Sequence, residues 1–253
     1  MRHELGLLEN ALDSLNEGLR KFQAGEGGDA HAYKFAVLHF AHSLELLFKH
    51  YVAQSHPLLI YKNPFSKKIE SENTIGLVDA VQFLRNEGKT LSEDLSNDLS
   101  WVKKIRNDIE HAQFEMDVHD VRRTIGRLIR ATMEFSADYD LLDLARNVEP
   151  DCKITFETLA DEYRANLAAA QAEAPDRSED GVAYDCSYCG ERKTAALVNS
   201  KYECIACKEK VTILECCQCG DDFPEIEVSV WNDDHPPKVD YICEACESYI
   251  LGR

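Results

Sequence analysis

The spacing of its cysteines limits what this chain can fold into more than any other feature. Nine of the ten cysteines lie between residues 186 and 246, mostly as C-x-x-C pairs that form two sets of four thiols. Four thiolates in two pairs meet the requirement of a closed tetrahedral zinc site. In a reducing compartment such pairs favour metal over disulfides. The expected ligands are Cys186, Cys189, Cys204 and Cys207 for one ion, and Cys216, Cys219, Cys243 and Cys246 for the other.

Glycine residues help to choose among the cysteines. A glycine directly follows Cys189 and Cys219, where it suits the tight turn of a metal-binding knuckle. This spacing selects Cys216 over Cys217 as the ligand. Protein sulfur then takes every position of both tetrahedral sites, so we expect two structural zinc ions per chain and no catalytic zinc.

The residues between the second set of cysteines predict a small β module. Residues 225–231 alternate apolar and polar and predict a strand, as does the run 239–242, with a turn at 232–237. The whole region 181–253 resembles two tandem zinc ribbons, which are too small to fold on apolar burial alone, so zinc binding supplies their folding energy. Such ribbons bind nucleic acid, bind protein or are purely structural. The excess of acidic over basic residues, 14 against 7, favours a protein or regulatory contact.

Before the cysteines, apolar residues recur every three or four positions, which predicts amphipathic helices. The segment 30–54 is apolar nearly all round, as a centrally buried helix would be. Ser92 and Asp117 are candidate N-caps. The expected helices span 3–23, 30–54, 74–86, 92–112 and 118–147. Residues 1–148 are therefore expected to form an up-and-down bundle of four main helices.

A further helix, near 155–173, and a polar linker at 175–181 are expected to join the bundle to the cysteine region. The predicted fold class is an all-α helical bundle followed by a small zinc-ribbon β module. The expected domains are the bundle at 1–148, a stalk helix with its linker at 149–180, and the tandem zinc ribbons at 181–253.

Charge and hydropathy restrict the partners and the location. The net charge is −18, so bulk charge will not bind nucleic acid, and any RNA contact must come from a local basic patch. No amino-terminal signal is visible. The most apolar stretch, 35–53, carries histidine and charged residues, which indicates a core helix and not a membrane span. We therefore expect a cytoplasmic protein with no membrane partner.

One helical segment carries residues suited to RNA cleavage. Arg106, Asn107 and His111 lie within two helical turns, and Asn107 and His111 share a face opposite the apolar stripe. Histidine can take and return a proton near neutral pH. Arginine binds phosphate with two N–H groups and stays charged. These residue types can cleave RNA through its own 2′-hydroxyl without a cation.

The position of Arg106 predicts a partner for its charge. Arg106 falls at the edge of the apolar sector of its helix, where a charge needs compensation. His42, Glu45 and Lys49 make a polar stripe on the otherwise apolar second helix. Glu45 is therefore the expected partner of Arg106, although Glu45 and Lys49 can also form an ordinary ion pair four residues apart.

The second helix with its sequence FAVLHFAHSLELLFK, the loop that begins at Pro57 and the Arg106-Asn-x-x-x-His111 motif resemble a HEPN-domain ribonuclease over about residues 1–148. The resemblance implies a composite site between two protomers, so a homodimer, and metal-independent cleavage that leaves a cyclic phosphate. His111 would transfer the proton, Arg106 would stabilise the charged phosphorane, and Asn107 would orient the substrate or His111. The resemblance also suggests a toxin or phage-defence effector, with an antitoxin or another protein regulator.

Two groups of basic residues could hold an RNA substrate. Lys103 and Lys104 precede Arg106, and Arg123, Arg127 and Arg130 are spaced four and three apart on the next helix. These arginines predict either a solvated charged face or a row of phosphate contacts.

The expected function is thus a dimeric endoribonuclease whose zinc ribbons select or regulate its target. Two alternatives remain open at this point. One is a non-enzymatic HEPN adaptor that dimerises and docks a protein partner through its ribbons. The other is an RNA-binding sensor without cleavage. The motif itself can also be read as part of a surface helix with three solvated polar residues.

Overall fold

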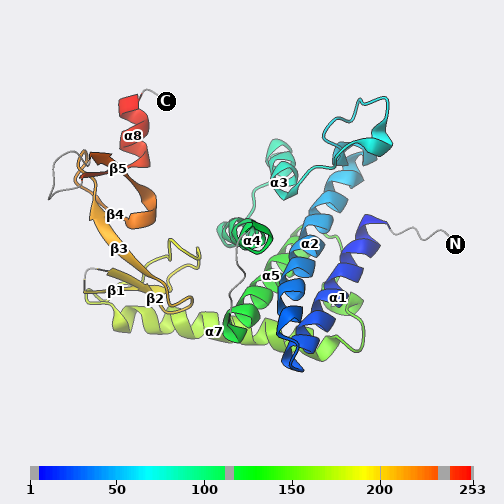
Figure 1. The fold of residues 1–253 in the computed structure, drawn as a ribbon, viewed down its shortest axis with the longest axis horizontal. Coiled ribbons are helices and arrows are strands. Elements are labelled where there is room, and N and C mark those ends of the chain that lie inside the picture. The colour runs from blue at the N-terminus through cyan, green and yellow to red at the C-terminus, as the bar shows by residue number, and fades with distance from the viewer. Residues whose placement is uncertain (1–5, 112–116, 200, 233–239, 252–253) are drawn as a thin grey trace. The chain divides into compact units, whose positions relative to one another are not determined.

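The computed structural model describes residues 6–111, 117–199, 201–232 and 240–251. The chain divides into two compact units, Met1–Arg164 and Ala165–Arg253, which we call unit 1 and unit 2. Helices dominate the first unit, and the second contains small antiparallel sheets, the end of α7 (Lys153–Arg177), helix α8 (Glu244–Leu251) and nine of the ten cysteines (Figure 1). The predicted fold class, a helical bundle followed by a small β module with two four-cysteine groups, is confirmed.

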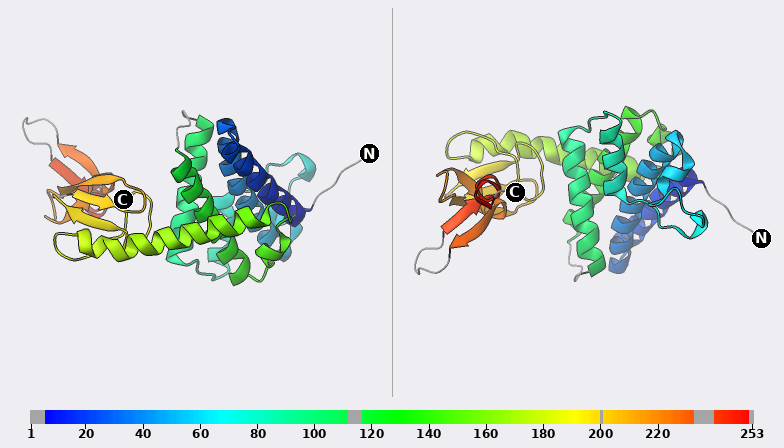
Figure 2. Two further views of the ribbon diagram at one scale, coloured as in Figure 1. Left: turned by 90° about the horizontal axis from the view of Figure 1, so that it is seen from below. Right: turned by 90° about the horizontal axis from the view of Figure 1, so that it is seen from above.

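Unit 1 is built around one central helix. The helices that begin in this unit are α1 (Leu7–Glu26), α2 (Ala30–Ser55), α3 (Leu77–Asn86), α4 (Glu93–His111), α5 (Val118–Asp138), α6 (Leu144–Asn147) and α7 (Lys153–Arg177), with short 3₁₀ turns η1 (Pro57–Ile60) and η2 (Ile69–Ser71). Helix α2 contacts α1, α3, α4 and α5. Helices α1 and α2 lie side by side (Figure 2).

The core of unit 1 explains why α2 is apolar on nearly every side. Phe40, Leu44 and Leu47 are all fully buried because neighbours cover α2 around its circumference. Phe48 stacks on Phe135 of α5, with ring centroids 3.7 Å apart. Each such buried side chain contributes on the order of 1.5–3 kcal/mol relative to exposure. The burial therefore fixes α2 as the scaffold for the polar groups that it carries.

Local sequence signals fix most helix starts. The Ser92 hydroxyl accepts a hydrogen bond from the Leu95 N–H at 2.9 Å at the start of α4, and Asp117 caps α5 by accepting from Asp120 N–H at 2.8 Å. The expected extent of the fifth helix to residue 147 is wrong. The helix ends at Asp138 because the chain turns into the left-handed conformation two residues later, at Asp140 (φ 50°), and α6 is a separate turn.

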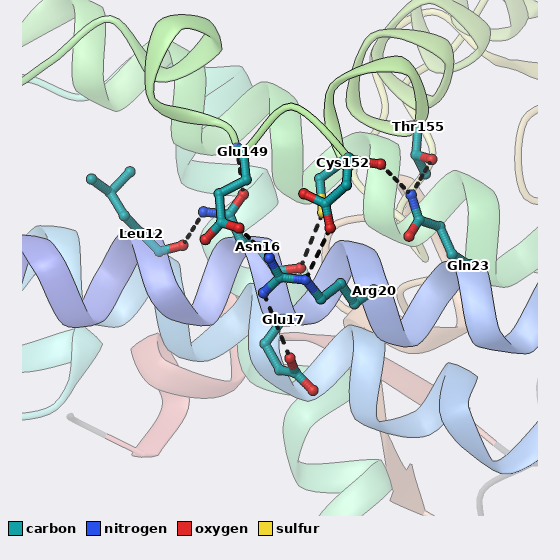
Figure 3. Close-up of polar contacts among 9 residues, drawn as sticks. Leu12, Asn16, Glu17, Arg20, Gln23, Glu149, Cys152 and Thr155 are labelled. Atoms are coloured by element: carbon teal, nitrogen blue, oxygen red, sulfur yellow. Dashed lines mark hydrogen bonds and ion pairs between the residues drawn. The ribbon is translucent and has the colours of Figure 1, made fainter.

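A polar junction holds the start of α7 on α1 (Figure 3). The Asn16 side chain accepts a hydrogen bond from the Glu149 N–H at 2.9 Å, and the buried Cys152 thiol donates to the Asn16 carbonyl at 3.6 Å. Gln23 donates to the Thr155 hydroxyl at 2.9 Å. These contacts satisfy the buried Asn16 and Cys152 and anchor the exposed turn at 149–151 to α1.

Unit 2 contains two antiparallel sheets. The strands β1 (Ala195–Val198), β2 (Lys201–Cys204), β3 (Lys210–Glu215) and β4 (Asp222–Pro224) pair in chain order, and β5 (Val228–Asn232) pairs with β6 (Asp240–Cys243) before α8 (Glu244–Leu251). The sequence predicted only the last two strands. The first of these was expected to begin at residue 225, but a 3₁₀ turn, η3 (Glu225–Glu227), comes first because residues 222–224 pair with β3. The turn was expected at 232–237; Asn232 is instead the last residue of β5, and the rest of that range lies outside the described residues.

Within the described residues, no helix combines the length and the apolar character needed to cross a membrane.

Candidate functional site

Eight cysteines of unit 2 form two groups of four, the same groups that their spacing predicts. In each group the sulfur atoms all lie within 4.8 Å of one another. In the first group the sulfurs of Cys186 and Cys207 are 3.7 Å apart, and those of Cys189 and Cys204 are 3.9 Å apart. A tetrahedral ion with metal–sulfur bonds of about 2.3 Å places its sulfurs about 3.8 Å apart. Each group could therefore hold a metal ion.

The backbone of each knuckle prepares the sulfurs for a metal. The Cys189 N–H donates to the Cys186 sulfur at 3.4 Å, and the chain then turns through Gly190 at φ 74°. Gly220 takes the equivalent conformation at φ 76° in the second group. Residues with a side chain rarely adopt this left-handed backbone conformation, which explains why glycine occupies both positions. Lys208 adopts it in the remaining knuckle of the first group, at φ 64°.

The two groups differ in exposure. All four cysteines of the first group are buried, whereas Cys219 is exposed and Cys246 is half-buried in the second. Backbone N–H donors, that of Cys219 first, lower the pKa of Cys216 to about 6, which favours the thiolate that binds metal. Cys217 lies outside the group and is exposed, while its N–H donates to the Tyr241 carbonyl at 2.8 Å.

A cavity of about 590 Å³ in unit 1 contains two of the three motif residues on its wall. Arg106 and Asn107 reach it from α4, Glu45 and Lys49 from α2, and other lining residues come from α3 and from the segment between α2 and α3. A cavity of this size is in the usual range for ligand sites. Arg106 and Asn107 therefore lie at a concave surface of the bundle.

Glu45 holds Arg106 and Lys49 together at this cavity. One Glu45 oxygen accepts a hydrogen bond from Arg106 Nη1 at 2.5 Å, and the other lies 2.7 Å from Lys49 Nζ. Both ion pairs considered from the sequence, Glu45 with Arg106 and Glu45 with Lys49, are therefore present at once. Burial alone would raise the pKa of Glu45, but Lys49 and Arg106 lower it overall, so Glu45 stays ionised at neutral pH. The Lys49 amino group also donates to the Thr74 hydroxyl at 3.1 Å.

The three motif residues occupy different positions around this ion pair. The Arg106 side chain is 43% exposed despite its contact with Glu45, so its guanidinium can still meet a ligand. Asn107 is exposed and lines the cavity. His111 is the last residue of α4, and its side chain lies outside the described part of the structure. The helix places the backbones of all three within two turns.

The basic residues expected to contact RNA separate into exposed and buried ones. Lys103 is exposed and lines the cavity, while the Lys104 amino group lies 5.5 Å from the Trp101 ring. Arg123 pairs with Asp120 at 3.2 Å.

The exposed arginine stripe expected from spacing does not include Arg127. The Arg127 side chain is buried, and its Nε donates to Asp98 at 2.6 Å. Arg130 donates to the same carboxylate oxygen at 2.6 Å. Their charges face α4 because Asp98, which is fully buried, attracts both. Arg127 is therefore a structural residue and neither a solvated one nor a phosphate contact.

Sequence reasoning missed Asp98, Lys62 and Arg85. Asp98 occupies a position within the apolar stripe of α4, three residues after Leu95, and a carboxylate at a core position could have signalled the buried pairs. Lys62 and Arg85 line the cavity from the segment after α2 and from α3. No local pattern connects those two residues with Arg106, because only the packing of the helices brings them together.

Comparisons with models of protein families, with curated proteins and with solved structures return no match to this chain.

Proposed function

We propose that this protein is an endoribonuclease that cleaves RNA through its own 2′-hydroxyl without a catalytic metal ion, and that its helical unit is of the HEPN type. The observation that carries the proposal is the Arg106–Glu45 pair. A carboxylate that is only 12% exposed fixes the direction of a guanidinium that remains partly exposed at a cavity. An arginine held in this way is preorganised for a phosphate, because little of its freedom is lost when the phosphate binds.

The proposed reaction needs one proton carrier and one charge stabiliser. The 2′-oxygen attacks the adjacent phosphorus as His111 removes its proton, and the bond from phosphorus to the 5′-oxygen breaks. A proton then returns to the leaving 5′-oxygen, so the products are a 2′,3′-cyclic phosphate and a 5′-hydroxyl. Arg106 stabilises the negative charge on the phosphorane, and Asn107 orients the substrate or His111. Positioned proton transfer of this kind accelerates a reaction by roughly 10²–10⁴-fold.

Two further properties belong to the proposal. The chain acts as a homodimer, because the face of α4 that carries the exposed Asn107 points away from the apolar stripe of its own helix. Each four-cysteine group holds a structural zinc ion, since all-thiolate sites of this geometry suit zinc. The zinc-bound unit then selects or regulates the RNA target, in keeping with a toxin or phage-defence effector under the control of a protein regulator.

The test is RNA cleavage by the purified full-length protein in a brief assay with EDTA, followed by sequencing of the RNA ends. The His111→Ala variant should lose roughly 10²-fold or more of the activity at unchanged helicity. His119→Ala removes an exposed histidine at the start of α5 and serves as the matched control. Equal cleavage by the wild type and His111→Ala would refute the assignment, as would 5′-phosphate ends in place of 5′-hydroxyl ends.

A further inference from the structure

Positive charge gathers at the cavity of unit 1, although the chain as a whole is strongly acidic. Five cationic residues but only two carboxylates line this cavity, in a chain of net charge −18. Three of these cations, Lys62, Arg85 and Lys103, are exposed. We call these three residues the basic rim. They come from the segment after η1, from α3 and from α4, so only the folded bundle assembles them.

The basic rim is not neutralised by the carboxylates of the cavity. Glu45 is occupied by Arg106 and Lys49, and Asp79 accepts a hydrogen bond from Gly76 N–H at 2.9 Å at the start of α3. Among the described residues, no carboxylate forms an ion pair with any member of the rim. Exposed cations that remain uncompensated around a cavity favour an anionic ligand.

A loop next to the rim adds an exposed aromatic ring to this charge. Phe65 is 93% exposed, and Lys67 and Lys68 beside it are exposed too. The stretch 57–69 contains three lysines and no acidic residue. An apolar ring in water among lysines is typical of surfaces that bind single-stranded nucleic acid, where bases stack on aromatic side chains and cations contact phosphates.

The loop is held in place and connects directly to the cavity. At its base, Lys62 N–H donates to the Asn73 carbonyl at 2.9 Å, and Ile75 N–H donates to the Ile60 carbonyl at 2.8 Å. At its tip, Phe65 N–H donates to the Asn63 side chain at 3.3 Å. Lys62 therefore belongs both to the loop and to the cavity wall. A ligand that contacts the loop can extend to Arg106 through Lys62.

We propose that the basic rim and the loop 61–68 bind single-stranded RNA, with Phe65 stacked on a base and Lys62, Arg85 and Lys103 in contact with phosphates on the way to Arg106. This inference rests on the proposed function and adds its substrate class. A duplex is excluded because Phe65 needs an unstacked base, and because a cavity of about 590 Å³ accommodates a nucleotide but not a double helix.

The experiment measures binding apart from cleavage, with the full-length His111→Ala protein and a fluorescent single-stranded RNA of about 12 nucleotides. Phe65→Leu keeps an apolar side chain but removes the stacking ring, and should weaken binding roughly 5- to 100-fold. Phe65→Trp should retain binding. Phe35→Leu, which alters an aromatic residue 49% exposed on α2, is the matched control.

The salt dependence of the same binding tests the basic rim. Lys62→Gln and Arg85→Gln should each reduce the slope of log Kd against log salt by about 0.7, the value for one phosphate contact to a single strand. Lys153→Gln, an exposed lysine of α7, should leave the slope unchanged. Unchanged affinity in Phe65→Leu together with unchanged slopes in the rim variants would overturn the inference. Equal affinity for duplex RNA, or equal competition by polyglutamate, would overturn it as well.

These outcomes are separable from those of the proposed function. If His111→Ala cleaves like the wild type while Phe65→Leu and the rim variants bind RNA weakly, the catalytic assignment fails and the RNA surface stands. If cleavage depends on His111 but binding ignores Phe65 and the rim, the surface fails and the catalytic assignment stands.

Discussion

At the residue scale, the arginines of unit 1 differ in what holds them. Arg127 is almost fully buried and directs its charge at the buried Asp98. Arg106 is also tied to a carboxylate, Glu45, but its side chain stays 43% exposed at the cavity. The same residue type is therefore buried in an ion pair on α5 but stays partly exposed at a cavity on α4, and only the second arrangement leaves the guanidinium open to a ligand.

Replacing Asp98 should strongly destabilise unit 1. Asp98→Asn keeps the size of the side chain but leaves Arg127 buried without its anion, which should lower the free energy of unfolding by about 3–5 kcal/mol. Urea denaturation measures this change. Asp94→Asn, at a 45% exposed position 3.9 Å from Arg130, is the control and should cost less than about 1 kcal/mol. A small effect of Asp98→Asn would mean that the arginines are compensated from elsewhere.

Glu45 predicts a defined dependence of stability on pH. Its pKa is lowered below the ordinary value of 4.5, so its contribution to stability is full above pH 4.5 and is lost as the pH falls through the lowered pKa. The difference in unfolding free energy between the wild type and Glu45→Gln should therefore be constant near neutral pH and shrink in acid. Urea denaturation from about pH 3 to pH 7 checks this. The exposed Glu70→Gln is the charge-matched control, and a difference that grows in acid would contradict the prediction.

The sequence predicted which residues share a face of one helix, but it mostly did not predict which residues of different helices come together. The partner of Arg106 could be anticipated because α4 shows its apolar face clearly and because Glu45 belongs to a polar stripe on the otherwise apolar α2. Burial of Arg127 was missed, because a spacing of three and four residues describes a helix face but does not show what covers it. Lys62 and Arg85 needed the tertiary structure.

At the element scale, the contact between α5 and α7 depends on one missing side chain. A Cβ added at Gly126 would lie 2.6 Å from the Cβ of Tyr163 and 2.9 Å from the Leu159 carbonyl oxygen. The backbones can therefore approach closely only because residue 126 is glycine. Helix periodicity revealed both helices, but it could not show that this glycine is the contact point.

Replacing Gly126 by alanine should destabilise the protein although alanine favours helices. The gain in helix propensity is about 1 kcal/mol. The clash with rigid backbone of α7 should outweigh it and leave a net loss of about 1–3 kcal/mol. Thermal unfolding of Gly126→Ala gives the sign. A variant more stable than the wild type would show that α7 can move away at little cost.

The number of bound metal ions should depend on the cysteines of the two groups of four and not on the cysteines outside them. Elemental analysis of protein purified without chelator should give two zinc ions per chain. Cys219→Ser removes a member of the second group and should lower the count, whereas Cys217→Ser, its neighbour outside the group, should leave the count at two. A loss of zinc in Cys217→Ser with retention in Cys219→Ser would reverse the ligand assignment.

The strands of unit 2 show why short elements resist prediction. The strands β1 to β4 are three to six residues long and lie between knuckles, so an apolar alternation has no room to develop. The cysteine spacing nevertheless predicted both groups, because the chemistry of the ligands is independent of strand length.

At the scale of the whole molecule, one helix belongs to both units. The boundary between the units falls inside α7, at Arg164 and Ala165. Up to Tyr163 the buried side chains of α7 pack within unit 1. After the boundary, Ala170 and Ala174 are buried, and Gln171 donates to the Arg192 carbonyl at 3.0 Å within unit 2. Each half of α7 therefore takes its stability from a different core.

This division predicts that removal of zinc will melt α7 only in part. A chelator should unfold unit 2, because its sheets are too small to persist without metal. The helix should then lose protection from hydrogen exchange after about residue 165 but keep it at residues 153–164. Hydrogen exchange with mass spectrometry before and after chelation measures both halves, and α1 and α2 serve as internal controls. Loss of protection throughout α7 would show that the two units fold as one, because the core of unit 1 would then depend on the metal as well.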